Sequence, residues 1–123
     1  MNIEFLAKNI VSYIEDDVCV VAFSNSKNPD SKKYLILSQS LFDTGEDDKM
    51  VSVDFGDGSG EMGCLNGVLN AVVIGPQKIT LKIKPNQSTN LKFSIALIQP
   101  LDSLVMRDMR RIFEKSEVNA IYL

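Results

Sequence analysis

The chain contains no histidine and only two cysteines among its 123 residues. Without histidine there is no Ser-His-Asp or Cys-His pair and no zinc site with a histidine ligand, so catalysis would depend on carboxylates, lysines or an unassisted cysteine. Cys19 and Cys64 have apolar neighbours and are too far apart in sequence for a paired redox or zinc motif. We therefore expect buried thiols rather than a reactive or bridged pair, and no enzymatic activity.

Long apolar segments and low-complexity tracts are also absent. No run approaches the ~20 apolar residues needed to cross a bilayer, and residues 1–8 lack the basic leader and apolar stretch of a signal peptide. The length and the hydrophobic fraction of 45% fit one domain, residues 1–123, that buries a core without disulfides or metal. We expect a single cytoplasmic domain that does not contact a membrane.

Alternation of apolar and polar residues predicts several strands. Residues 78–84 alternate isoleucine or leucine with lysine or threonine, which is the pattern of a strand with one buried face. Residues 91–97 repeat the pattern, and the loop-forming residues between the two segments favour an antiparallel hairpin. Residues 51–55 alternate in the same way, and residues 68–74 are a further candidate.

Two segments are apolar without alternation. Residues 18–23 and 34–37 predict central strands that are covered on both faces. Residues 3–13 have an ambiguous pattern, and we favour a strand there.

A single segment near the C-terminus has the period of a helix. Its apolar stripe consists of Leu101, Val105, Met109, Ile112 and Phe113. Asp102 is placed to cap the amino end, and basic residues follow near the carboxyl end of a helix from about 101 to 115. Together these elements predict an α+β fold: one antiparallel, curved sheet of about six to eight strands with one amphipathic helix packed on a face.

The acidic residues are concentrated in one part of the chain. Seven of the sixteen fall between residues 43 and 61, namely Asp43, Glu46, Asp47, Asp48, Asp54, Asp57 and Glu61. Against Lys49 alone they give this segment a charge of −6, and since the chain sums to −3 the remainder carries +3. Such a surface repels nucleic acid and can steer a basic protein. The alternative is that these are solvated loops that keep the domain soluble.

The glycines within this acidic segment do not complete a known ligand loop. Aligned as an EF-hand loop, the first and twelfth positions are Phe55 and Asn66, so both required carboxylates are missing. No Lys-Ser/Thr pair follows the glycines as in a phosphate loop. A catalytic pair such as Asp54 with Asp57 would require burial that the sequence does not indicate. We expect no metal, cofactor or nucleotide.

Basic residues gather elsewhere, on two predicted strands and the predicted helix. They are Lys78, Lys82, Lys84, Lys92, Arg107, Arg110 and Arg111. The sequence pI near 4.9 and the lack of interleaved exposed aromatics favour a solvated face over a nucleic-acid site.

Three short motifs occur in a fixed order: Glu15-Asp16-Asp17 before residues 18–23, then Tyr34-Leu35-Ile36-Leu37-Ser38-Gln39-Ser40, then Asn66-Gly67-Val68-Leu69 ahead of residues 72–83 and the helix. This order resembles the immunity protein family numbered ten of bacterial polymorphic toxin systems. It implies a small cytoplasmic protein that binds a cognate toxin and blocks it, without catalysis or cofactor.

On this interpretation the seven acids would face a cationic toxin, with Phe42, Met50 or Met62 beside them as apolar anchors. Phe42 is the sharpest single candidate, although an ordinary core position at a strand end is the alternative. A structural module that forms a homodimer through a sheet face or an edge strand is the competing hypothesis. The two differ in salt dependence, because an acidic interface weakens with salt and an apolar one does not.

Overall fold

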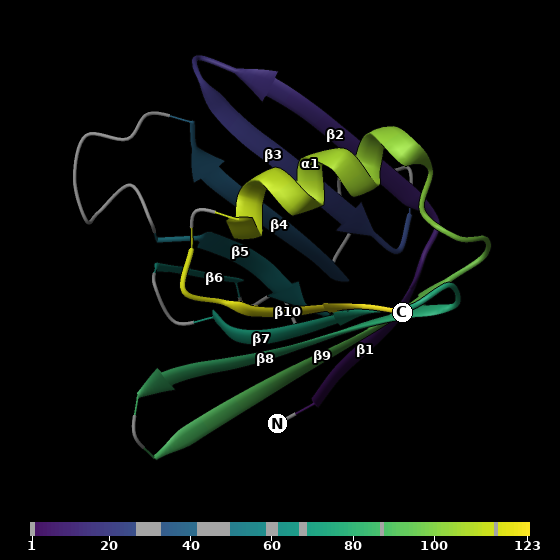
Figure 1. Ribbon diagram of the computed structural model, residues 1–123. Coiled ribbons are helices and arrows are strands. Elements are labelled where there is room, and N and C mark those ends of the chain that lie inside the picture. The colour runs from purple at the N-terminus through teal and green to yellow at the C-terminus, as the bar shows by residue number, and fades with distance from the viewer. Residues whose placement is uncertain are drawn as a thin grey trace.

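The computed structural model describes residues 2–26, 33–41, 50–58, 62–66, 69–86, 88–114 and 116–123 (Figure 1). These residues form ten strands and one helix. The strands are β1 (Asn2–Ala7), β2 (Asn9–Glu15), β3 (Val18–Ser24), β4 (Lys33–Ser40), β5 (Ser52–Asp57), β6 (Met62–Asn66), β7 (Leu69–Ile74), β8 (Lys78–Asn86), β9 (Thr89–Leu97) and β10 (Asn119–Tyr122). The helix is α1 (Ser103–Glu114).

The strands belong to two five-stranded sheets, so the predicted single sheet of six to eight strands is wrong. Sheet A has the order β1-β9-β8-β7-β10, and sheet B has the order β2-β3-β4-β5-β6. Sheet B is an antiparallel meander of consecutive strands. Sheet A is mixed, because β1 pairs with β9 and β10 pairs with β7 in parallel.

The chain divides between the sheets at Lys8. The backbone bends there, and the Lys8 N–H donates to the Ser24 carbonyl at 2.9 Å, which anchors the start of β2 beside β3. A segment that reads as one strand in sequence is therefore two strands in different layers. Two packed layers allow each sheet to bury one face, which a single sheet with one helix could not do for so many strands.

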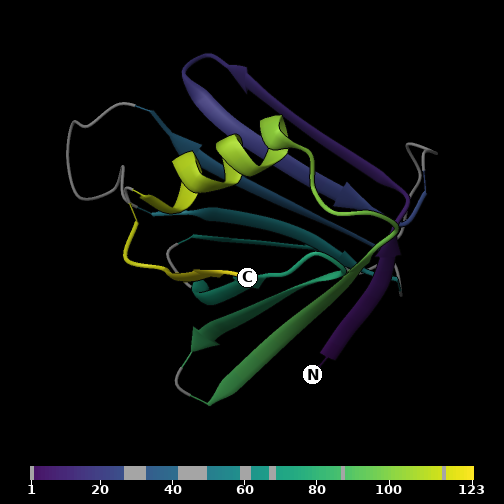
Figure 2. The same cartoon turned by 45° about the vertical axis from the view of Figure 1, so that its right-hand side comes forward.

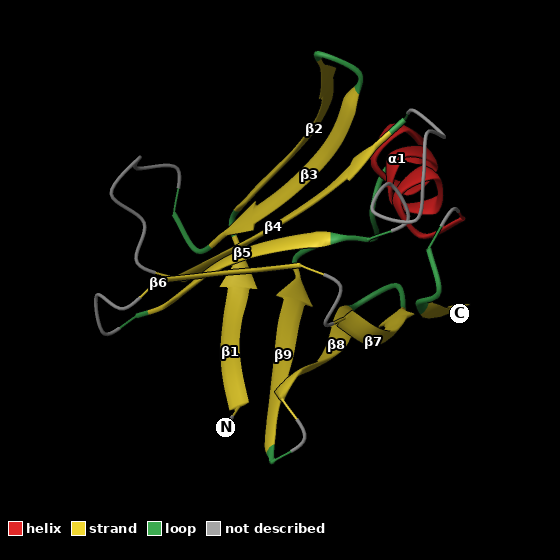
Figure 3. Cartoon of the chain, turned by 90° about the vertical axis from the view of Figure 1, so that its left-hand side faces the viewer, coloured by secondary structure: helices red, strands yellow, loops and turns green. Residues whose placement is uncertain are grey.

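The strands of sheet A meet sheet B at a steep angle, and α1 occupies the space beside the same face of sheet B (Figure 3). Figures 1 and 2, which differ by a 45° turn, both show α1 lying across β2, β3 and β4. One end of this inner face of sheet B therefore packs on sheet A and the other on α1. Phe55 and Phe93 illustrate the first contact, with ring centroids 5.4 Å apart in an edge-on arrangement.

The helix agrees with its prediction in position, cap and buried stripe. The Asp102 carboxylate accepts a hydrogen bond from the Val105 N–H at 2.9 Å, which satisfies one free donor of the first turn. Val105, Met109 and Ile112 are buried in the core that both sheets share. The predicted hairpin is also present as β8 and β9.

The prediction that residues 18–23 and 34–37 are covered on both faces is wrong for the described part of the chain. Both segments do lie in interior strands, β3 and β4. However, burial alternates along each strand: Val21 and Phe23 have no exposed surface, whereas Val20 and Ala22 on the other side are only partly buried. Sheet B thus has an outer face that is apolar and incompletely covered.

Candidate interaction surface

The outer face of sheet B carries two adjacent rows of side chains that cross β2, β3, β4 and β5. The strand register aligns Val11, Ala22, Ile36 and Asp54 in one row, and Tyr13, Val20, Ser38 and Ser52 in the next. We call these eight residues the outer-face rows. Val11 and Tyr13 are 42% and 46% exposed, and the six others are partly buried.

The local sequence explains why this surface forms. Valine, isoleucine and tyrosine favour extended backbone and pack well as cross-strand neighbours, so they stabilise the strands even where only one face is buried. The one helix of the described residues lies on the opposite, inner face, where the Cys19 thiol meets the Asp108 carbonyl at 3.6 Å. Contiguous apolar surface of this kind, rimmed by polar groups, is typical of an interaction site.

The two outer faces of the molecule carry opposite charge. Among the described side chains, the outer face of sheet B holds the carboxylates Asp54 and Glu15 and no lysine or arginine, and Asp16 and Asp17 form the turn beside it. The outer face of sheet A holds Lys78, Lys82, Lys84 and Lys92 against one acid, Glu4. Sheet B therefore presents an apolar and acidic surface, and its field attracts basic molecules.

Two of the predicted partner-binding residues can be placed in this structure. Asp54 belongs to the outer-face rows. Asp57 has the opposite parity along β5 and lies beside Lys33 in the strand register. The other predicted partner-binding residues lie outside the described residues: Phe42, Asp43, Glu46, Asp47, Asp48 and Glu61. The role of Phe42 as an anchor therefore stays a prediction.

The geometry offers no acid pair at Asp54 and Asp57, because the alternation of β5 directs them to opposite faces of sheet B. The described residues also contain no group of three or more cysteine, aspartate or glutamate side chains that could hold a metal ion. What this surface offers is therefore shape, apolar contact and charge.

A buried polar cluster lies where α1 meets β3 and is chemically quiet. Asp108 is 3% exposed, with its carboxylate 3.4 Å from Arg107 Nε and 3.8 Å from Arg111 Nη1. Burial raises the pKa of the Cys19 thiol, and the Asp108 charge raises it further. A thiol of this kind stays protonated and is a poor nucleophile. The predicted burial of Cys19 is confirmed.

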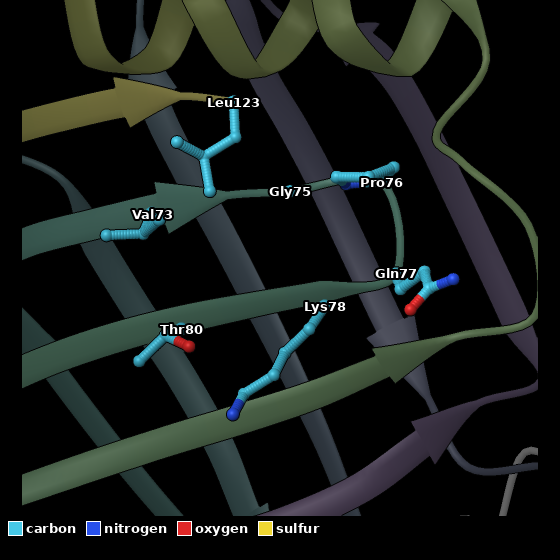
Figure 4. Close-up of a pocket in the computed structure, with 7 residues that line it drawn as sticks. All are labelled: Val73, Gly75, Pro76, Gln77, Lys78, Thr80 and Leu123. Atoms are coloured by element: carbon cyan, nitrogen blue, oxygen red, sulfur yellow. The ribbon is translucent and has the colours of Figure 1, made fainter.

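A shallow pocket of about 290 Å³ lies at the turn between β7 and β8 (Figure 4). It is formed by Val73, Gly75, Pro76, Gln77, Lys78, Thr80 and Leu123. The Gly75 N–H donates a hydrogen bond to the Lys78 carbonyl at 2.9 Å and closes this turn. Lys78 is its one ionisable side chain, so the pocket lacks the convergent polar groups of an active site.

The residues that sequence reasoning missed are the apolar members of the outer-face rows. A continuous apolar run was the available signal, but it does not distinguish a strand covered on both faces from one that presents an apolar face outward.

No protein-family model matches the chain, and no curated protein matches it. Among the described residues, no helix is long and apolar enough to span a membrane.

Proposed function

We propose that this protein is a non-catalytic binding domain that holds a cationic protein partner against the outer face of sheet B. The observation that carries the proposal is the coincidence, on one open face, of the outer-face rows with carboxylates and with no described basic side chain. Apolar and aromatic groups supply contact energy at such interfaces, while the charges set association rate and partner choice.

The class of partner we propose is a basic toxin domain, and the mechanism is occlusion. An inhibitor that works by occlusion needs a preformed surface and no reactive group. The rigid interior strands β3 and β4 suit that role, since residues on sheet strands are positioned more firmly than residues on loops. Asp43, Glu46, Asp47 and Asp48, which lie between β4 and β5 in the sequence, stay part of this proposal as a source of long-range steering, because their negative charges attract a basic partner.

The test compares three variants that each gain one lysine. Ile36→Lys and Asp54→Lys alter the outer-face rows, and Thr80→Lys adds to the outer face of sheet A the same single charge that Ile36→Lys adds to sheet B, as the matched control for that variant. Tagged parent protein should recover a basic protein from a lysate of the cells that encode it. Co-expression of that protein's gene should arrest growth, and the parent protein should restore it.

We expect Ile36→Lys to weaken binding at least about 30-fold, the effect of losing a contact worth about 2 kcal/mol. Asp54→Lys should slow association most at low salt. Thr80→Lys should bind as the parent does. Equal binding by all three variants, or growth arrest that the parent does not relieve, would contradict the proposal.

A further inference from the structure

Strand β2 is an open sheet edge without the usual protection. It forms the margin of sheet B, with β3 on one side and no described strand on the other (Figure 1). Its seven residues contain no lysine, proline or glycine, and Val11, Tyr13 and Ile14 are each more than 40% exposed. Proteins normally shield such edges with lysine, proline, a bulge or a cover, because a bare edge pairs with other strands.

The other edges of the two sheets differ from β2. At β1 the Lys33 ammonium donates to the Glu4 carbonyl at 3.2 Å, so a charged side chain already occupies that edge. β10 has four residues and its Tyr122 ring lies 4.0 Å beneath the Arg110 guanidinium. β6 has five residues, including Gly63. Among the described strands, β2 is therefore the longest sheet edge and the one that exposes the most large apolar side chains.

The charges at the two ends of β2 complement each other. Exposed Lys8 precedes the strand, and exposed Glu15, Asp16 and Asp17 end it. When such a strand pairs antiparallel with an identical strand, the basic end of each copy meets the acidic end of the other. Two symmetric attractions then form at once, as in other two-fold interfaces. A parallel arrangement would instead bring like charges together.

We infer that two copies of this chain associate through antiparallel pairing of their β2 strands about a two-fold axis at Ser12. A two-fold axis perpendicular to the sheet keeps each face of the sheet on the same side, so each residue must pair with a residue of the same face. The axis must therefore pass through a residue of β2, and the alternative registers move it to a neighbouring residue. Pairing about Ser12 opposes Val11 to Tyr13 and Ile10 to Ile14 of the other copy.

Neighbouring registers are poorer. Pairing about Val11 would oppose Lys8 to Ile14, and pairing about Tyr13 would oppose Val11 to Glu15. Only the register about Ser12 combines valine–tyrosine and isoleucine pairs, which are favourable across strands, with Lys8 beside Asp16. The two B sheets would then form one continuous ten-stranded sheet. This dimer goes beyond the proposed function, and it leaves Val20 and Ile36 accessible.

Sedimentation velocity over about 1 to 500 µM tests association, since strand pairing of this size belongs to the small interfaces that dissociate on dilution. The parent should shift from monomer to dimer as concentration rises. Val11→Lys should weaken the dimer at least about tenfold, whereas Ile121→Lys, which makes the same type of change at a 45% exposed residue of β10 in sheet A, should not. A parent that is monomeric throughout, or a Val11→Lys variant that dimerises like the parent, would overturn the inference.

Three variants that each add one cysteine then test the register, in a Cys64→Ser background whose remaining native cysteine, Cys19, is fully buried. A residue on the axis faces its own copy with Cα atoms about 4.5–5.5 Å apart, within the range that a disulfide spans. Ser12→Cys should form a disulfide-linked dimer fastest, ahead of Val11→Cys and Tyr13→Cys. Faster linking at either neighbour would refute pairing about Ser12. Circular dichroism of each variant checks that it is folded, and the result is independent of any toxin-like partner.

Discussion

Replacing Gly63 with alanine should destabilise the fold by about 1–3 kcal/mol, the usual effect of adding a methyl group to a filled site. Gly63 on β6 is the cross-strand partner of Phe55 on β5. A Cβ atom at Gly63 would lie 2.5 Å from both Cε1 and Cζ of the Phe55 ring. The ring must therefore move, and it is not free to do so.

The movement of Phe55 is resisted by Phe93 in the other sheet. The two ring centroids are 5.4 Å apart and their planes meet at 71°. Losing this arrangement would remove about 0.5–1.5 kcal/mol beyond the area buried, so part of the expected destabilisation at Gly63 is lost contact between the sheets. The effect of Gly63→Ala thus depends on the size of residue 55.

Urea unfolding followed by circular dichroism measures the change, and a double-mutant cycle isolates its cause. In a Phe55→Leu background, where the colliding ring atoms are absent, Gly63→Ala should cost less than about 0.5 kcal/mol. Gly75→Ala is a milder comparison, since its Cβ would lie 3.3 Å from the Lys78 carbonyl oxygen, a tight contact rather than a collision. An equal destabilisation in both backgrounds, or none in the parent, would refute this explanation.

Three further predictions concern the turn, the helix cap and the buried thiol. Asp17 has a φ of 62° in the β2–β3 turn, where glycine is less strained than other residues. Asp17→Gly should therefore add about 0.5 kcal/mol of stability and raise the melting temperature. A lower melting temperature would contradict the assignment of strain. Asp102→Ala should lower the free energy of unfolding in urea by about 1 kcal/mol, because the Val105 N–H loses its acceptor. Asp102→Asn should retain most of that free energy, because its side-chain oxygen can still accept the bond. Burial raises the pKa of the Cys19 thiol in the folded protein above its ordinary 9.0. As pH rises past 9, this thiol therefore loses its proton in the unfolded chain before it does so in the folded protein, and the free energy of unfolding should fall. Cys19→Ala should flatten that decline in melts at pH 8 to 10.5; an unchanged slope would argue against it.

Elements with local signals were predicted from the sequence. Alternation identified β8 and β9, and spacing with Asp102 identified α1. The division into two sheets was not predictable in this way, because β1 pairs with β9, about ninety residues later, and that pairing depends on packing. Residues 3–13 gave no local mark of the bend at Lys8 beyond a single charged residue.

The candidate surface was predicted only in part. Asp54 was identified by charge, and the structure adds Val11, Tyr13, Val20 and Ile36 beside it. Apolar periodicity reports that residues favour a strand, and it does not report what covers each face. An exposed apolar face and a doubly buried strand therefore look alike until the other layers are known.

The arrangement of sheet A has a consequence for synthesis on the ribosome. Sheet B joins neighbouring segments and can pair as each emerges, whereas β1 must wait for β9, whose last residue is Leu97. Until then Ile3, Phe5 and Ala7 of β1 have no strand partner in sheet A, although they are buried in the finished protein. The nascent chain thus carries an apolar segment that aggregation or a chaperone can capture, and its order of assembly differs from its order of translation.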